Sequence, residues 1–443
     1  MWYKIKTNYY RFRNSSGFRS TVILMVLGIV SQLLGMTRDI ILANKIGVGE
    51  TLDIYYASFR VPDFIYATLI SIVAGVTIIP MLSRAIHDKD WEEVSHKFSS
   101  LFNFFSIFTL GITALAYIFM PNIVHFIFSH TSIDWQMSVV SLSRLMLWQP
   151  ILLNISNIFS TLAMVENKFL TYAVAPLFYN LGIILGATVL YDSMGTDGLV
   201  YGVVIGAAMH LLVQSISFWN SKVKFKFKAF DMKVIREELG LAIPRSLSLI
   251  MLQVRSMFVA STATAMGAGV FTSYTFANNF FLLPVTAIGI SYVTVAFPRL
   301  SAMYESGYII DLNKKIQKDI SLLLICSVPV SILFYFYSKN IIHFVYPNIK
   351  DISQITIMLS TLSCTLPLYI MSLYYVRCSF ARRDAISPLI SQSLAAVTII
   401  IVMYMLYARG YGVLSIVYAF NAGIALEAIS IYFLFYTKKK NIE

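Results

Sequence analysis

The sequence predicts an all-α polytopic membrane protein with about 12 transmembrane helices, and its composition provides the first evidence. Of its 443 residues, 58% are hydrophobic and only 13% are charged, and the mean hydropathy is +0.72. Soluble domains carry about 25% charged residues. The apolar residues form runs of roughly 20 or more, the length of helix that crosses ~30 Å of hydrocarbon. Because backbone polar groups must satisfy each other in lipid, these runs are expected to be helices.

The predicted spans follow one another along the chain. The first begins near Thr21 and continues past Leu34 without a small-residue cleavage site, so we predict a retained span rather than a signal peptide. The predicted spans are residues 20–46, 52–83, 97–121, 137–165, 168–191, 197–219, 235–263, 270–298, 316–338, 354–379, 386–408 and 411–437.

The placement of basic residues predicts the topology. Most of the 34 Lys and Arg residues fall in the two termini and in the connections on the same side of the membrane as the termini. The connections on the opposite side hold Lys45, Lys339, Lys350 and Arg409. Since cytoplasmic segments carry an excess of basic residues, we predict that both the N and C termini are cytoplasmic. The net charge of +12 is therefore attributed to topology rather than to nucleic-acid binding.

A basic segment divides the chain into two halves. Its lysines alternate with Val223, Phe225 and Phe227, which predicts a cytoplasmic linker on anionic lipid headgroups, with a specific partner site as the alternative. With six spans in each half, both halves have the same orientation in the membrane. We therefore predict two lobes with a substrate cleft between them. The predicted domains are a basic cytoplasmic N-terminus, 1–19, an N-lobe, 20–220, the linker, 221–234, a C-lobe, 235–437, and a cytoplasmic tail, 438–443.

The two halves carry similar short motifs in the same order. Arg38 in the first half and Arg255 in the second are each followed by a Gly-x-Gly sequence, an aromatic–alanine pair and a Pro-x-Leu-Ser sequence. This internal repeat supports the prediction of two lobes. Because glycine adopts backbone conformations that other residues avoid, the Gly-x-Gly positions are candidate hinges at the rim of the cleft. These positions are Gly47, Gly49, Gly267 and Gly269.

Arginines inside the predicted spans suggest a binding site. An ionisable side chain near mid-bilayer costs about 2.5–3.5 kcal/mol and persists mainly where it pairs, faces a wet cavity or has a function. Arg38 and Arg255 hold corresponding places in the two halves, and Arg60 lies in the second span. Cations that face each other favour a bound anion, and the planar guanidinium group suits phosphate. We therefore predict that Arg38, Arg60 and Arg255 bind a phosphate or diphosphate group.

Structural roles stay open for each charge within a span. Arg144 can extend its side chain to the headgroups, and Arg60 can pair with Asp63 at i, i+3. Asp39 can hold the preceding arginine in place or cap a kink in the helix. Glu427 in the last predicted span can be a buried, neutral carboxylic acid, because desolvation disfavours its charged form.

Motifs for catalysis or metal binding are missing. The six histidines form no HxxxH or HExxH pattern, and the chain has neither a P-loop nor a GxGxxG sequence. Cys326, Cys364 and Cys378 form no CxxC pair and are predicted to be small packing residues. We therefore predict a transporter rather than an enzyme, with no cofactor and no metal. Transport would be driven by an ion gradient, by the membrane potential or by consumption of the substrate on the far side of the membrane.

Several motifs resemble the MurJ/MviN family of lipid II flippases, within the larger group that also holds the MATE antiporters. Residues 31–39, SQLLGMTRD, are similar to the family's S-R-x-L-G-x-x-R-D, and residues 380–388, FARRDAISP, resemble F-Y-A-x-x-D-x-x-[ST]-P. Further matches are Gly47, Gly49, Asp53, Phe59-Arg60-Val61-Pro62, Pro80, Phe276-Ala277, Pro284 and Pro298. The resemblance covers nearly the whole chain. It implies a flippase of the bacterial inner membrane that moves lipid II or a related polyprenyl-diphosphate-linked saccharide by alternating access, with membrane lipids and envelope-synthesis proteins as candidate partners.

The chain departs from the family pattern at several positions. The Asp-Arg pair of the family's Y-A-D-R falls on Asn278 and Asn279, and Gln32 replaces the first arginine of the first motif. We expect Asn278, Asn279 and Asp39 to contribute to the substrate site together with the three arginines. Family members often have two further spans, so a tail groove formed by those spans is expected to be absent.

Two other functions stay open. A cation-coupled drug antiporter of the MATE type would use Asp39 or Glu427 as its ion site. Multidrug efflux that Asp39→Asn abolishes would favour this function. A non-transporting scaffold for envelope synthesis would instead retain its role after Arg38→Ala and Arg255→Ala.

Overall fold

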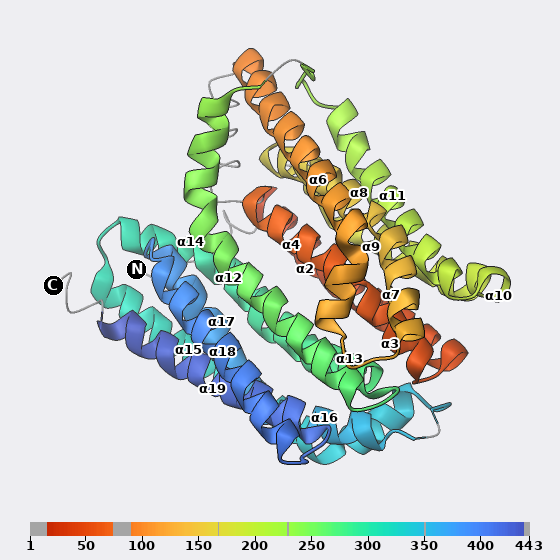
Figure 1. The fold of residues 1–443 in the computed structure, drawn as a ribbon. Coiled ribbons are helices and arrows are strands. Elements are labelled where there is room, and N and C mark those ends of the chain that lie inside the picture. Colours follow the sequence, from red (N-terminus) through yellow and green to blue (C-terminus); the bar gives the residue numbers. More distant parts are fainter. Residues whose placement is uncertain (1–15, 74–89, 167, 228–229, 350, 438–443) are drawn as a thin grey trace. The chain divides into compact units, whose positions relative to one another are not determined.

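The computed structural model describes residues 16–73, 90–166, 168–227, 230–349 and 351–437. Within these ranges every regular element is helical (Figure 1), which confirms the predicted all-α fold. The α-helices are α2 (Ser16–Ile46), α3 (Glu50–Ser58), α4 (Arg60–Val73), α6 (Trp91–Ile127), α7 (Ile133–Met146), α8 (Trp148–Val165), α9 (Phe169–Leu185), α10 (Tyr191–Met194), α11 (Thr196–Trp219), α12 (Met232–Ala265), α13 (Val270–Pro284), α14 (Ser291–Glu305), α15 (Ile309–Val345), α16 (Ser353–Ser363), α17 (Leu366–Ala381), α18 (Ile386–Ala408) and α19 (Leu414–Thr437). Two π-helical segments, η1 (Gly186–Leu190) and η2 (Val285–Ile290), continue α9 and α13.

Most of the predicted spans coincide with long apolar helices. In the described part of the chain, nine helical stretches are long and apolar enough to cross a membrane, and the bent pair α16–α17 makes a tenth. The other two predicted spans, residues 52–83 and 235–263, fall on α3–α4 and on α12. Residues 74–83 of the former, which include Pro80, lie outside the described residues. The count of 12 and the cytoplasmic placement of both termini therefore stay predictions.

The chain forms two compact units. Unit 1 comprises Met1–Arg38, Ile72–Thr113 and Trp148–Ala242, and unit 2 comprises Asp39–Ser71, Ala114–Leu147 and Ile243–Glu443. The units interleave along the chain, since α2, α4, α6 and α12 each begin in one unit and end in the other. The boundaries of the predicted N-lobe and C-lobe stay a prediction.

Unit 1 contains a notably close helix pair, α9 and α11. A Cβ atom built on Gly182 would lie 2.2 Å from the Cα of Gly206, and one on Gly202 would lie 2.5 Å from the Cα of Gly186. Such a distance leaves no room for a side chain at these positions. Small residues let helix backbones approach closely in a membrane, where van der Waals packing replaces the hydrophobic effect between helices.

Unit 2 contains a helix break that side chains stabilise. Helices α16 and α17 are bent by 53° relative to each other. The Thr365 hydroxyl at the break donates to the Asn421 Oδ1 at 2.7 Å, and the Asn421 amide donates to the Thr361 carbonyl at 2.7 Å. The bond to the Thr361 carbonyl adds a side-chain partner for the backbone beside the break, and breaks within lipid need such partners.

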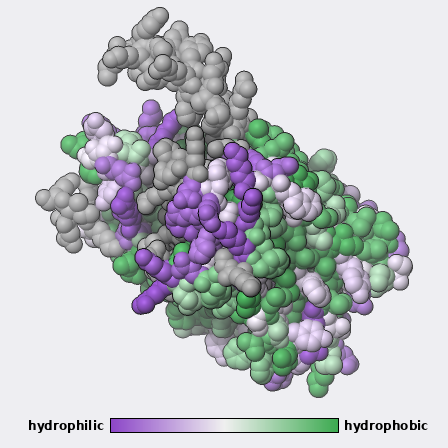
Figure 2. Space-filling model, turned by 90° about the horizontal axis from the view of Figure 1, so that it is seen from above, coloured by the Kyte–Doolittle hydropathy of each residue, from purple (hydrophilic) through white to green (hydrophobic). Residues whose placement is uncertain are grey.

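Large apolar side chains are exposed on many helices. Phe126 and Phe344 are each 85% exposed, and Tyr404 is 73% exposed. Figure 2 shows hydrophobic residues over much of one face, with hydrophilic residues gathered in one area. Soluble monomers rarely expose apolar patches above a few hundred Å². These helix surfaces are therefore suited to contact with lipid.

Candidate functional site

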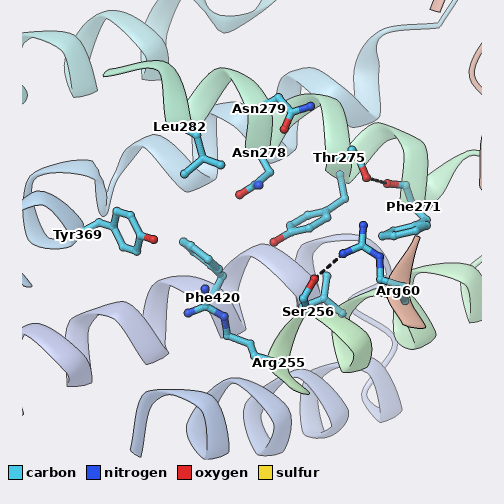
Figure 3. A pocket seen from close by; sticks show the side chains of 12 residues that line it. Arg60, Arg255, Ser256, Phe271, Thr275, Asn278, Asn279, Leu282, Tyr369 and Phe420 are labelled. Carbon is cyan, nitrogen blue, oxygen red and sulfur yellow. Dashed lines mark hydrogen bonds between the residues drawn. The ribbon is translucent and has the colours of Figure 1, made fainter. Parts of the chain in front are cut away.

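A pocket in unit 2 contains two of the three arginines that the sequence singled out (Figure 3). Its volume is about 210 Å³. It is lined by Arg60 from α4, by Arg255, Ser256 and Val259 from α12, by Phe271, Tyr274, Thr275, Asn278, Asn279 and Leu282 from α13, by Tyr369 from α17 and by Phe420 from α19. Helix α13 supplies half of the lining, because it presents one face to the pocket along several turns.

Arg60 is held at the pocket wall by contacts on several sides. Its Nη1 donates to the Ser256 hydroxyl at 2.5 Å and its Nε donates to the Tyr56 carbonyl at 3.4 Å. The guanidinium carbon lies 5.0 Å from the centre of the Phe271 ring. Asp63 acts on it electrostatically, and the predicted pairing of Arg60 with Asp63 at i, i+3 stays a prediction. These contacts orient the guanidinium group while its charge remains at the pocket surface.

Arg255 lines the pocket and interacts electrostatically with a buried acid. Its guanidinium carbon is 5.3 Å from the centre of the Phe420 ring, and it interacts with the charge of Glu427. Glu427 is only 3% exposed and hydrogen-bonds to the Ser372 side chain. The charge of Glu427 therefore acts on Arg255 from within the protein. The sequence had singled out both residues, but it placed them in different predicted sites.

The two asparagines predicted from the family resemblance both line the pocket. The side-chain amide of Asn279 donates to Asp39 Oδ2 at 2.6 Å, which joins α13 to α2 within unit 2. Asp39 is 2% exposed. Its carboxylate is therefore engaged by an amide within the protein. The predicted substrate-binding and ion-coupling roles of Asp39 stay predictions.

Arg38 belongs to unit 1, whereas the pocket belongs to unit 2. Its Nη1 donates to Asn180 Oδ1 on α9 at 3.2 Å, and the Asn180 amide donates to the Pro176 carbonyl at 3.2 Å. Asn180 therefore orients Arg38 from a neighbouring helix, a contact that the sequence analysis did not foresee. The predicted joint site of Arg38 with Arg60 and Arg255 stays a prediction.

Sequence reasoning also missed the role of Asp53, a buried carboxylate that caps a helix of the second half. Asp53 on α3 is 2% exposed. It accepts hydrogen bonds from the backbone N–H of Gly269 at 2.5 Å, and from the N–H and the hydroxyl of Thr272 at 2.8 and 2.7 Å. A carboxylate is stabilised at a helix N-terminus because unpaired N–H groups point toward it. Asp53 therefore joins α3 to the N-terminus of α13. We call these three hydrogen bonds the Asp53 latch, and the conformation in which they are formed the latched state.

The glycines predicted as hinges surround this latch. Gly47, Gly267 and Gly269 have φ values of 85°, 127° and 82°, in the region that favours glycine. Gly49 has an extended backbone with φ of 173°, which any residue adopts. Gly269 is also close to the first half, because a Cβ atom there would lie 3.2 Å from Val48 Cγ1. Whether these residues act as hinges stays a prediction.

Arg144, the fourth arginine within a predicted span, lies outside the pocket lining. Its Nε donates to the Tyr117 carbonyl at 3.1 Å, and its guanidinium carbon lies 4.7 Å from the centre of the Tyr117 ring. In the described residues, no group of three or more His, Cys, Asp or Glu side chains has the geometry of a metal site.

Comparison with known proteins gives a consistent family. The family model described as lipid II flippase MurJ matches residues 42–443. A probable lipid II flippase MurJ from Buchnera aphidicola subsp. Acyrthosiphon pisum is 25% identical over 332 residues, which are 73% of this chain and 64% of that protein. The chain thus spans less than two thirds of that relative. A probable lipid II flippase MurJ from Treponema pallidum is 21% identical over 415 residues, or 89% of this chain and 77% of that protein.

Two solved structures share the fold. A lipid II flippase MurJ in an inward closed conformation has a TM-score of 0.80 and 22% identity, and the likeness covers 93% of this chain and 87% of that one. An inward-facing MATE family multidrug resistance transporter of the MOP superfamily has a TM-score of 0.78 and 16% identity, with coverage of 92% and 94%. At these identities the likeness concerns the fold alone.

Proposed function

Because the chain belongs to the MurJ family of lipid II flippases, we propose that it translocates lipid II or a related polyprenyl-diphosphate-linked saccharide by alternating access. The protein is a multi-pass protein of the bacterial inner membrane. Its substrate is lipid-linked, and membrane lipids surround it. The identity of the saccharide and the envelope-synthesis proteins that act with it belong to the proposal.

The observation that carries the proposal is the charge of the pocket. Arg60 and Arg255 line it, and none of its described lining residues is an Asp or a Glu. Arginine binds phosphate through parallel N–H···O bonds and stays protonated at every physiological pH. A cavity for cationic drugs would place acidic groups at its surface. The lining therefore favours a diphosphate group.

The size of the pocket limits what it can hold. Its volume of about 210 Å³ lies below the roughly 300–1,000 Å³ of sites for drug-sized ligands. We infer that the pocket receives the diphosphate of the substrate rather than the whole glycolipid. Asn278, Asn279 and Tyr369 add hydrogen-bonding groups to its wall, which would orient the phosphates or the first sugar.

The contacts between α13 and the first half support alternating access. The Asp53 latch and the Asp39–Asn279 bond both join helices of the first half to α13. The topology predicts that Asp53 lies near the outer end of its span. Opening the outer side would require these bonds to break, and their loss would need compensation from substrate contacts that favour the open state.

The proposal also assigns a substrate contact to Arg38 and chooses between Asp39 and Glu427 as the ion-coupling residue. We propose that Arg38 meets the substrate diphosphate during the cycle, from its place beside Asn180 on unit 1. Glu427 is the better candidate for coupling to an ion, because it is buried and the charge of Arg255 acts on it. Substrate binding at Arg255 would weaken the attraction between these two residues and change the affinity of Glu427 for a proton or a cation.

Native mass spectrometry of the purified protein tests the proposal directly. We expect a co-purifying polyprenyl-diphosphate lipid in the wild type, and its loss in Arg60→Ala and Arg255→Ala. Arg144→Ala is the matched control, because Arg144 lies within a span but outside the pocket lining. Equal lipid occupancy in all four proteins would contradict the proposal. Multidrug efflux in cells that Asp39→Asn abolishes would favour the MATE-type function instead.

A further inference from the structure

The linker, residues 221–234, is fixed to α6 of unit 1 by a row of polar side chains. Ser95, Ser99 and Asn103 are spaced four residues apart and therefore share one face of the helix. The Ser95 hydroxyl accepts from the backbone N–H of Lys224, and the Ser99 hydroxyl accepts from that of Lys226, both at 2.9 Å. The Asn103 amide donates to the Lys226 carbonyl at 3.3 Å. The segment up to Phe227 is therefore an ordered strip.

This attachment sets which linker side chains face the protein. Val223 is 5% exposed and joins the hydrophobic core of unit 1. The Phe225 ring packs edge-on against the Phe102 ring, with 4.9 Å between centres. Lys222 and Lys224 are exposed. Since alternate residues of an extended segment point in opposite directions, the Lys224 side chain is presented outward. The Lys222 ammonium group is exposed as well, but it lies 5.3 Å from the centre of the Trp91 ring at the start of α6.

Exposed aromatic and apolar groups lie beside these cations. Phe227 is 85% exposed, Met232 is 61% exposed and Phe230 is 51% exposed. Trp219, the last residue of α11, is 71% exposed. Exposed aromatic residues next to basic ones, directly after a membrane-spanning helix, are typical of the interface between hydrocarbon and headgroups.

The acidic residues near this surface neutralise few of its cations. Glu92 pairs with Lys226 at 3.1 Å, and Glu93 pairs with Lys97 of the same helix. Asp231 uses its Oδ1 to accept the backbone N–H groups of Lys233 and Val234. Among the residues that the structure describes, no acidic partner lies within 4.0 Å of Lys222, Lys224 or Lys233 to form an ion pair.

We propose that the linker is a docking surface for anionic phospholipid headgroups of the cytoplasmic leaflet. Lys222, Lys224 and Lys233 would contact phosphate groups, while Phe227 and its apolar neighbours enter the acyl boundary. The charge is complementary to an anionic bilayer, and the position directly after α11 places the surface at the bilayer edge. This surface is in unit 1 and shares no residue with the pocket, so the proposal is independent of the proposed function.

Quenching of Trp219 fluorescence by brominated lipids tests this proposal. The full-length protein is placed in phosphatidylcholine nanodiscs that contain brominated phosphatidylglycerol or, at the same mole fraction, brominated phosphatidylcholine. Subtracting the signal of Trp219→Phe isolates this residue. We expect stronger quenching by the anionic lipid, with a loss of about fivefold in this preference for each lysine replaced. The preference for the anionic lipid should also weaken at 1 M salt, where the Debye length is about 3 Å.

The lysine variant is Lys222→Gln/Lys224→Gln/Lys233→Gln, and its control is Lys339→Gln/Arg409→Gln, which removes exposed cations from the predicted outer side. For the apolar contact, Phe227→Ser is compared with Phe344→Ser, because both side chains are 85% exposed. Equal quenching of the wild type by the two lipids, or a preference that survives in the triple lysine variant, would overturn the proposal. Because the replaced side chains are exposed, thermal unfolding of all variants should match the wild type.

Discussion

The pocket and the linker both concentrate cations, but they hold them in different surroundings. In the pocket, Arg60 and Arg255 are partly buried, and each guanidinium lies over a phenylalanine ring. In the linker, Lys222 and Lys224 are exposed. The first arrangement orients a few hydrogen bonds toward one ligand, whereas the second provides diffuse positive charge toward a surface.

The residue types follow from this difference. Arginine remains charged when buried, binds phosphate in a defined plane and stacks on aromatic rings. Lysine is a compact, strongly hydrated charge on a flexible stem. The chain therefore has arginine where an anion must be oriented and desolvated, and lysine where the anions stay hydrated. Four variants test how far this contrast holds, from the largest expected effect to the smallest.

Arg255→Ala is expected to have the largest effect, because it leaves the buried Glu427 carboxyl without the cation that acts on it. A buried carboxyl group that loses the favourable charge of a nearby cation is destabilised in its ionised form. We expect a clear fall in thermal stability and a loss of binding to undecaprenyl diphosphate. Arg255→Ala/Glu427→Gln should recover much of the stability but none of the binding. Recovery of binding in the double variant would contradict the assigned role of Arg255.

Asp53→Asn tests a buried anion rather than a cation. It weakens the charge-assisted hydrogen bonds to Gly269 and Thr272, so we expect the latched state to lose about 2 kcal/mol. With the native cysteines replaced, a thiol reagent should label Ser273→Cys faster in the Asp53→Asn background, since Ser273 is 2% exposed in the latched state. Asp351→Asn is the control because Asp351 is an exposed carboxylate. An unchanged labelling rate would mean that Asp53 does not hold the latch.

Arg60→Lys keeps the charge of the pocket but removes the planar donor group that contacts Ser256. We expect about tenfold weaker binding of undecaprenyl diphosphate, since hydrogen bonds to charged groups contribute about 1.5–3 kcal/mol. Isothermal titration calorimetry in detergent measures this change. If the Arg60→Lys variant binds the lipid as well as the wild type does, the pocket attracts the lipid by charge alone. The contrast between oriented hydrogen bonds in the pocket and diffuse charge in the linker would then be wrong.

Lys224→Arg is expected to have the smallest effect. The side chain is exposed, and its backbone N–H, rather than its side chain, bonds to Ser95. Because the charge is kept, the preference of Trp219 for anionic lipid should stay within about twofold of the wild type. A large gain in preference would show that the linker orients phosphate groups as the pocket is proposed to do.

Several features of the fold and the site could be predicted from the sequence, because they depend on local properties. Long apolar runs predicted helices, and the comparisons confirm the family that the motifs resemble. Arg60 and Arg255 stood out because charges in a span are costly, and both line the pocket. Asn278 and Asn279 were found only through the family resemblance.

Other parts of the site had weak or no local signals. Asp53 was visible as an acid near a predicted span end, yet its partners Gly269 and Thr272 are more than 200 residues away. The nearest hint was that Thr272 lies three residues after Gly269, the N-cap residue of α13, so its backbone N–H is one of those that the start of a helix leaves unpaired. Likewise, the serines of α6 gave no indication that they would hold the linker.

By itself, the sequence determined that this is a membrane protein, where its helical elements lie and which family it resembles. It also identified the charged residues within predicted spans, whose free-energy cost in lipid suggests a function. These follow from residue chemistry summed over neighbouring positions. Only the tertiary structure decided which groups meet: Arg60 with Ser256, Asp39 with Asn279, and Asp53 with the start of α13. The physical reason is that a buried charge is stabilised by partners within a few ångströms, and helix packing brings those partners together from distant parts of the chain.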